Sequence, residues 1–406
     1  MPALAAAATL SLEEALATAL QDSLKVELAG VELAQGRQAL AEGVASVMPD
    51  LSASYSTSGS SFAEMGDTWR LGFSLTQPVV DATAFFGVLR GFREKEYYKA
   101  KSARTIADLV LAVQGEYYDL ARAQALVSSA ERQYRRAVEN SRIVGRRYEI
   151  GEANLADRLR AEADLFTKET ELLSARNAVA EKQRTLSDLI GLDRWEAMAV
   201  EELPSPQEPS ALPTTAISAA LLERNPELTV LRMQVEASEV AYWSAWGELL
   251  PALSFSYSRG STFGGGGLFP GEENDDTRYG LVVSFPVVDV ADRVLGLTGA
   301  RLDRKQSRLE LAQARLDARE RLASLVDTQE LSYKEWESAS KTVELSEEVY
   351  RLNARSYELG GVSFDELLQV EAELGQAERA RVEAQARYWS SRAELNYVLG
   401  TSVEER

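Results

Sequence analysis

The chain contains neither cysteine nor histidine among its 406 residues. Their absence excludes disulfide scaffolds, thiolate zinc sites, and mechanisms that use a Cys or His nucleophile or a His-based triad. No apolar run reaches the roughly 18 residues of a membrane-spanning helix. Acidic residues outnumber basic ones, 63 to 44, for a formal charge of -19, which argues against a nucleic-acid partner. We therefore expect no metal site, no cofactor and no enzymatic activity.

The chain is an internal duplication. The segment that begins at Pro49 returns at Pro251, and the segment that ends at Asp81 returns ending at Asp289. We assign residues 11–193 to a first repeat, with a strand pair at about 50–77, and residues 214–402 to a second, with a strand pair at about 252–285. The Pro- and Glu-rich residues 194–213 are typical of an extended linker, and 403–406 form a tail. Residues 1–10, apolar without a basic region, are interpreted as a trimmed signal remnant or a disordered start.

Each repeat contains a helix too long for a compact domain. One alternating 3/4 apolar register runs from Ile106 to Tyr148, and no proline interrupts the segment from about Thr83 to Ile150, which predicts a helix on the order of 100 Å long. The opening helix, about Leu12–Val47, and the return helix, about Leu155–Ile190, are each about half that length. Placed end to end, the two shorter helices would match the long one. This arithmetic favours a bundle of long helices flanked by stacked shorter ones, with a plain coiled-coil rod as the alternative.

Between the helices, short segments alternate apolar and small polar residues, which predicts strands. One face would carry serine at nearly every second position and line a lumen. The other would face lipid, and its members are Leu51, Tyr55, Trp69, Leu71, Phe73, Leu253, Phe255, Tyr257, Tyr279, Leu281 and Phe285. A half-buried sheet in a soluble sandwich has the same period. Four strands cannot close a barrel in lipid, so the chain must oligomerise. Prolines mark the bends between helix and strand: Pro49, Pro78, Pro251 and Pro286.

With these features, the chain resembles the TolC family of outer-membrane efflux proteins over residues 10–402. The resemblance rests on the proline-led strand entries, on the Pro-x-x-Asp exits, and on a Tyr-x-x-Gly turn at Tyr148–Gly151 and Tyr357–Gly360. It implies a mixed α and β fold: a long α-helical coiled-coil barrel joined to a transmembrane β-barrel, with four strands per protomer and 12 per homotrimer. It also implies a periplasmic adaptor protein, an inner-membrane transporter and outer-membrane lipid as partners, and a periplasmic gate at the helix tips.

The resemblance places gate residues just beyond each tip glycine. The candidates are Asp157, Arg158, Arg160, Asp365, Glu366 and Gln369. Val362 and Gln369 depart from the family pattern, where basic and acidic residues are usual. The acids can equally be N-terminal helix residues that favour the dipole, and the arginines solvated surface charges. For adaptor docking at the tips the candidates are Tyr148, Ile150, Gly151, Glu152, Tyr357, Leu359, Gly360 and Gly361, of which the glycines are first of all helix C-caps.

We interpret the chain as the outer-membrane exit duct of a tripartite efflux pump, which conducts substrates passively to the exterior and extends far into the periplasm. The alternatives are the exit duct of a type I protein-secretion system and a structural or adhesive trimeric coiled-coil surface protein. An acidic wall would favour cations. Because a duct only relays its cargo, the residues do not identify what is exported.

Overall fold

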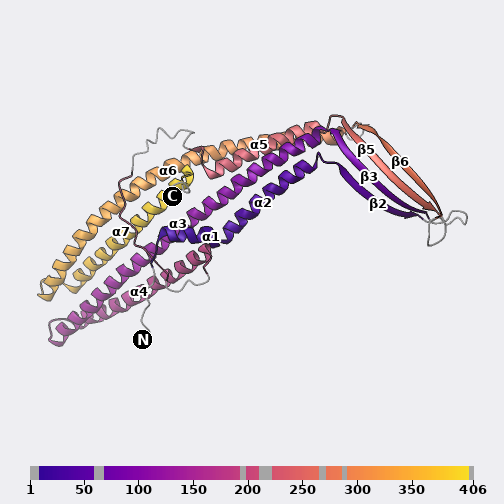
Figure 1. Cartoon of the computed structure of the whole chain (residues 1–406). Helices are drawn as coiled ribbons and strands as arrows, with labels where there is room; N and C mark the ends of the chain where they lie inside the picture. The colour runs from indigo at the N-terminus through magenta and orange to yellow at the C-terminus, as the bar shows by residue number, and fades with distance from the viewer. Residues whose placement is uncertain are drawn as a thin grey trace. The chain divides into compact units, whose positions relative to one another are not determined.

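The computed structural model describes residues 9–58, 68–192, 198–209, 222–264, 271–285 and 290–401. Its helices are α1 (Leu12–Asp22), α2 (Leu24–Ala45), α3 (Ala82–Glu149), α4 (Leu155–Ile190), α5 (Pro226–Gly247), α6 (Val290–Glu358) and α7 (Phe364–Leu399). Its strands are β1 (Thr9–Leu10), β2 (Asp50–Ser58), β3 (Thr68–Val80), β4 (Ala199–Val200), β5 (Ala252–Gly264) and β6 (Gly271–Ser284), labelled in part in Figure 1. The predicted bend at Pro286 lies outside the described residues.

The long helices occur where the apolar register predicts them. Helix α3 has 68 residues and α6 has 69, so each is about 100 Å long at 1.5 Å per residue. Helices α4 and α7 have 36 residues each. Within the described ranges, no helix is both long enough and apolar enough to cross a membrane.

The predicted opening helix, about Leu12–Val47, is instead two helices. Ser23 separates α1 from α2 with an extended backbone, φ -73° and ψ 135°. Its N–H still donates to the Ala19 carbonyl, while its hydroxyl accepts a long 3.4 Å hydrogen bond from the Lys25 N–H. Ser23 therefore ends one helix and caps the next, a role that serine fills without any proline or glycine. The prediction of one continuous helix was wrong at this residue.

Capping residues also fix several other helix ends. Ser11 and Glu14 form a reciprocal capping box at the start of α1. At the C-termini of α4 and α7, Gly191 and Gly400 adopt the left-handed conformation, with φ of 81° and 72°. Glycine adopts this conformation with little penalty, so both helices end at the corresponding residue of their repeat.

The four longer strands form one antiparallel sheet in the order β2-β3-β5-β6 (Figure 1). Residues paired directly across neighbouring strands lie on the same face of the sheet. The register therefore aligns their side chains in rows that cross all four strands. One row is Leu51, Leu75, Tyr257 and Tyr279, and the neighbouring row is Ser52, Ser74, Ser258 and Arg278. The Ser52 and Ser74 hydroxyls are 2.6 Å apart. The alternation in the sequence thus separates an apolar face from a small polar face.

Pro78 does not end its strand as expected. Strand β3 continues to Val80, and its register against β5 shifts between Pro78 and Val80. The change from strand to helix comes at Asp81, whose carboxylate accepts from the Thr83 N–H at 2.8 Å and from the Thr83 hydroxyl at 2.6 Å. Pro78 lacks an N–H group, and this is tolerated because the hydrogen-bond ladder between β3 and β5 is irregular there. Asp81 then caps the start of α3.

The chain divides into two compact units that cut across the two repeats. The first comprises Met1–Ala29, Ala103–Pro226 and Arg315–Arg406, and the second comprises Gly30–Ser102 and Glu227–Ala314. The second unit holds the four-stranded sheet. Each unit draws on both repeats, so the sequence repeats 11–193 and 214–402 are units of duplication rather than compact bodies.

The core of the first unit lies where α1, α3 and α4 meet. Leu109, Val113 and Leu120 of α3 are fully buried there against Leu186 and Ile190 of α4. Next to this core, β1 pairs in parallel with β4. Thr9 and Leu10, assigned by sequence to a remnant or disordered start, are therefore in a short strand, and so is part of the segment expected to be an extended linker.

Candidate functional site

The two helix tips in the first unit are tight turns built around glycine. Gly151 and Gly360 have φ of 80° and 78°, the left-handed region that favours glycine. After the first turn, Asn154 begins α4 by accepting from the Asp157 N–H at 2.8 Å. After the second, Ser363 begins α7 by accepting from the Glu366 N–H at 3.2 Å. Both acids thus occupy the first turn of a helix, where negative charge is favourable.

Three predicted gate residues come together across the two tips. Nη1 of Arg160, on α4, lies 2.9 Å and 2.8 Å from the two carboxylate oxygens of Asp365 on α7. The same guanidinium is 3.8 Å from Asp157, one turn earlier on its own helix. All three side chains are solvent-accessible. The contact links the first repeat to the second within one chain.

The remaining gate candidates make local contacts. Arg158 pairs with Glu162 on its own helix at 3.1 Å and lies over the Tyr148 ring at 5.3 Å from the centroid. Gln369 donates to Glu373, one turn further along α7, at 3.1 Å. Among the described residues, neither Arg158 nor Gln369 contacts the opposite tip.

Arg147 is a tip residue that is not among the sequence-predicted site residues. Its guanidinium stacks over the Tyr357 ring at 4.8 Å and donates to the Tyr357 carbonyl at the end of α6. The ring is buried against Phe364. Burial raises the pKa of the Tyr357 hydroxyl, with Arg147 opposing the rise and Asp157 adding to it. A basic residue in the last turn of α3, directly before the Tyr-x-x-Gly motif, was the available signal.

The predicted docking residues include two exposed apolar side chains. Ile150 is 69% exposed and Leu359 is 75% exposed, each directly before its tip glycine. Glu152 and Gly361 follow the glycines and are also exposed, whereas Tyr357 is buried. Each tip therefore presents one exposed apolar side chain directly before an exposed glycine.

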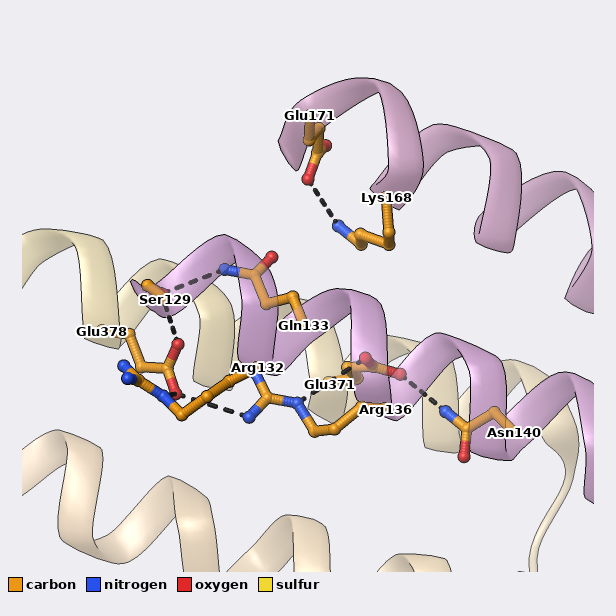
Figure 2. A network of polar contacts seen from close by, with 9 residues as sticks. All are labelled: Ser129, Arg132, Gln133, Arg136, Asn140, Lys168, Glu171, Glu371 and Glu378. Carbon is orange, nitrogen blue, oxygen red and sulfur yellow. Dashed lines mark hydrogen bonds and ion pairs between the residues drawn. The ribbon is translucent and has the colours of Figure 1, made fainter. Parts of the chain in front are cut away.

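Further along the same helices, a buried polar network joins α3 to α7 (Figure 2). Glu378 is 1% exposed and accepts hydrogen bonds from the Ser129 hydroxyl at 2.5 Å and from Arg132 Nε at 3.3 Å. Burial raises the pKa of Glu378, but the hydrogen bond from Ser129 and the charges of Arg136 and Arg132 outweigh it. The pKa of Glu378 therefore lies below its ordinary value.

A second buried carboxylate occupies the same network. Glu371 of α7 is 3% exposed and accepts a hydrogen bond from Asn140 Nδ2 of α3 at 2.7 Å. Arg136 lies between the two glutamates, 3.4 Å from Glu378 and 3.7 Å from Glu371. Burial raises the pKa of Glu371 to about 7, and the negative charge of Asp164 adds to the rise. The sequence indicated no such group, because both acids belong to a helix with many exposed charges.

Comparison with known proteins places the chain in a family. The family model described as outer membrane efflux protein matches residues 15–192 and 217–401. The alkaline protease secretion protein AprF of Pseudomonas aeruginosa is 25% identical over 294 residues, which cover 66% of this chain. The chain matches 59% of the length of AprF.

Solved structures agree at the level of the fold. The outer membrane protein VceC of Vibrio cholerae superposes with a TM-score of 0.83 at 20% identity, covering 96% of both chains. The outer membrane channel CmeC of Campylobacter jejuni gives a TM-score of 0.86 at 15% identity, covering 96% of this chain and 86% of CmeC.

The duplicated helix and strand plan and these matches define an outer-membrane channel protein with a periplasmic helical extension. The chain belongs to the outer membrane efflux protein family. Its fold class and its place in the outer membrane are as the resemblance to the TolC family implied. The family consists of channels rather than enzymes.

Proposed function

We propose that the chain assembles as a homotrimer that forms a passive exit duct, fed by a periplasmic adaptor and an inner-membrane transporter. The four-stranded sheet carries this proposal. It presents an exposed apolar face, with Leu51 at 75% and Tyr279 at 78% exposure, and its outer strands β2 and β6 have no further strand beside them among the described residues. Open edges are not tolerated in lipid, and three copies give the 12 strands that the family resemblance implies.

The helices support the same assembly. On α6, leucines at strict sevens are each about 60% exposed or more: Leu295, Leu302, Leu309 and Leu316. On α4, Leu159, Phe166 and Leu173 form a second exposed heptad seam. Each seam fits an apolar seam of another helix by coiled-coil packing. The two seams lie at different levels along the helices, so each would meet a different apolar surface of a neighbouring copy, and such head-to-tail contacts form a ring when the rotation between copies closes.

Oligomeric mass in detergent tests the assembly. The unaltered chain is expected to be a trimer, and the double change L302E/L309E is expected to weaken it by placing charge in the seam. K305E changes charge on an exposed residue of the same helix and is the matched control. A stable monomer of the unaltered chain would contradict the proposal.

The tips are proposed as the adaptor-docking surface and the gate. Ile150 and Leu359, exposed beside glycine backbone, support docking of an apolar partner, and the contact between Arg160 and Asp365 supports a tie that holds the tips together. I150E/L359E should abolish binding to the co-expressed adaptor, measured on purified proteins. L24E alters an equally exposed leucine on α2 and should leave binding intact.

Two cargo classes are proposed, and one cellular experiment separates them. Small-molecule efflux is the first, because it is the commoner use of such ducts. Protein secretion is the second, supported by the similarity to a protein described as serving alkaline protease secretion. In cells that lack the chain, loss of secreted protein with unchanged drug susceptibility would identify secretion, and the reverse would identify efflux.

A further inference from the structure

The polar network between α3 and α7 contains two buried carboxylates, Glu371 and Glu378, and its hydrogen bonds do not satisfy all of their oxygen atoms. Arg136 is the one cation that reaches both Glu371 and Glu378 in the described part of the chain. Its Nε atom is 3.7 Å from Glu371 Oε1, too far for a hydrogen bond. Glu371 Oε1 and the Nε and Nη2 atoms of Arg136 are buried without a hydrogen-bond partner. A buried network that is only partly satisfied responds strongly to a change of charge.

The two carboxylates differ in their surroundings (Figure 2). Glu378 has a hydroxyl and two guanidinium groups around it, and ionisation there is favoured. Glu371 has one hydrogen bond, from Asn140, and shares Arg136 with Glu378. One carboxylate is therefore held charged, while the other is left with little to stabilise a charge.

Groups on every neighbouring helix act on Glu371. From α3 come Arg136 and Asn140, and from α4 come the negative Asp164 and the positive Lys168. From α6, Tyr350 packs beside Arg136, with the guanidinium 5.6 Å from the ring centroid. Lys168 is itself paired with Glu171 at 3.1 Å, and burial raises the pKa of Asp164. Burial and Asp164 disfavour charge on Glu371 more than the two cations favour it.

We propose that Arg136, Glu371 and Glu378 form a proton-dependent clamp that positions α7 on α3, and that loss of the proton from Glu371 loosens it. Glu378 and Arg136 are the permanent ion pair of the clamp. Glu371 is the group that changes its protonation state. When it is protonated, it packs against α3 through its hydrogen bond with Asn140. When it is ionised, its buried carboxylate is shielded from water and lies beyond hydrogen-bond distance of Arg136.

The direction follows from linkage. The pKa of Glu371 is raised, so the seated helix holds the proton more tightly than a helix whose glutamate reaches water. Raising the pH from the ordinary value of 4.5 to about 7 therefore favours the loosened state. For one proton, the equilibrium between the two states changes by at most about tenfold per pH unit in this window.

Pulsed electron paramagnetic resonance measures the distance directly. Because the chain has no cysteine, V138C on α3 and Q376C on α7 accept spin labels at those two exposed sites alone. Labelled chains are diluted with unlabelled ones so that each distance is within one chain. Between pH 4.5 and 8 we expect the distribution to lengthen or broaden as the pH rises toward about 7 and to stay constant above it, and E371Q to keep the low-pH distribution throughout.

Two further variants keep the test decisive. E373Q removes an exposed carboxylate two residues along α7 and should retain the full pH response. D164N removes the negative charge that adds to the rise and should move the midpoint to lower pH, which is informative even if E371Q does not assemble. A distribution that does not change with pH, a response that survives E371Q, or a midpoint unmoved by D164N would each overturn the clamp.

A link from the clamp to the gate at the tips rests on the proposed function. In planar bilayers, open probability should rise with pH in the unaltered protein and stay constant in E371Q. A pH-dependent distance without a pH-dependent conductance would overturn the link alone. Conductance absent from the unaltered protein at every pH would instead overturn the proposed duct.

Discussion

The two tips descend from one ancestral turn, yet their charges have become complementary. Tyr148 and Tyr357 are counterparts 209 residues apart, so Arg147 corresponds to Ser356 and Arg160 to Gln369. The acid Asp365 corresponds to Ala156. The arginines that bridge the tips thus belong to the first repeat. The oxygen atoms that accept their hydrogen bonds, on Tyr357 and Asp365, belong to the second.

The buried network shows the same division. Arg136 of α3 corresponds to Leu345 of α6, which is 69% exposed, and Asn140 corresponds to Val349. Glu378 of α7 corresponds to the exposed Glu169 of α4. The two repeats have the same backbone plan, but their side chains have diverged. Buried polar contacts join α3 to α7 within the chain, whereas Leu345, Val349 and Glu169, at the corresponding positions on α6 and α4, are exposed. Changing matched positions in the two repeats tests this comparison.

The largest difference in the free energy of unfolding is expected between E378A and E169A. Removal of Glu378 leaves Arg136 buried beside a single weak partner, and loss of one member of a buried pair costs roughly 3–5 kcal/mol. Removal of the exposed Glu169 should cost less than about 0.5 kcal/mol. Denaturant unfolding in detergent measures both, and equal effects would contradict the division between fastened and surface positions.

A smaller difference is expected between R147A and S356A. Arg147 donates to the Tyr357 carbonyl and covers its ring, and a hydrogen bond from a charged group contributes about 1.5–3 kcal/mol. S356A should be nearly neutral. Hydrogen exchange of the amides around Tyr357 reports the local loss, and unchanged protection in R147A would show that the arginine does not hold the second tip.

Substitution of either tip glycine by alanine should lower stability by a similar amount. This pair is therefore a control for backbone geometry, which is the same in both tips. G151A and G360A each place a Cβ on a left-handed residue, at a cost of about 1–2 kcal/mol. Neither added Cβ meets an atom closer than 3.6 Å. At Gly400 the added atom would also collide with the Arg224 carbonyl. Thermal unfolding should therefore rank G400A below the two tip variants, and a reversed order would contradict this account.

The smallest effect on stability is expected for R160A. Its contact with Asp365 is exposed, and such pairs contribute about 0.2–1 kcal/mol. If this contact ties the gate, open probability in planar bilayers should nevertheless rise, whereas Q369A at the matching position should change it little. A silent R160A would remove this pair from the gate.

The sequence predicted most of the fold because its signals are repeated and periodic. Heptads placed α4 at Leu155–Ile190, and alternation predicted the two faces of the sheet. The break at Ser23 was missed because serine fits equally well inside a helix or at its cap. The pairing of β1 with β4 was missed because two residues carry no period.

The site was less predictable because pairing across helices depends on rotation as well as spacing. Asp157, Arg160 and Asp365 were selected from the family resemblance, and the structure brings them together. Glu371 and Glu378 were not selected, since a glutamate on a charged helix is usually solvated. Their burial depends on how α3 and α7 turn toward each other, which a single helix does not encode.

The central pairing of the sheet has a consequence for biosynthesis. Strand β3 ends at Val80 and pairs with β5, which begins at Ala252, so the middle of the sheet joins residues separated by α3, α4, the linker and α5. Contacts so distant along the chain form slowly, because a long loop must close before any bond repays the entropy. In a nascent chain, the β3 edge of the β2-β3 pair therefore stays unpaired until β5 has been made, and protection from aggregation matters most during that interval.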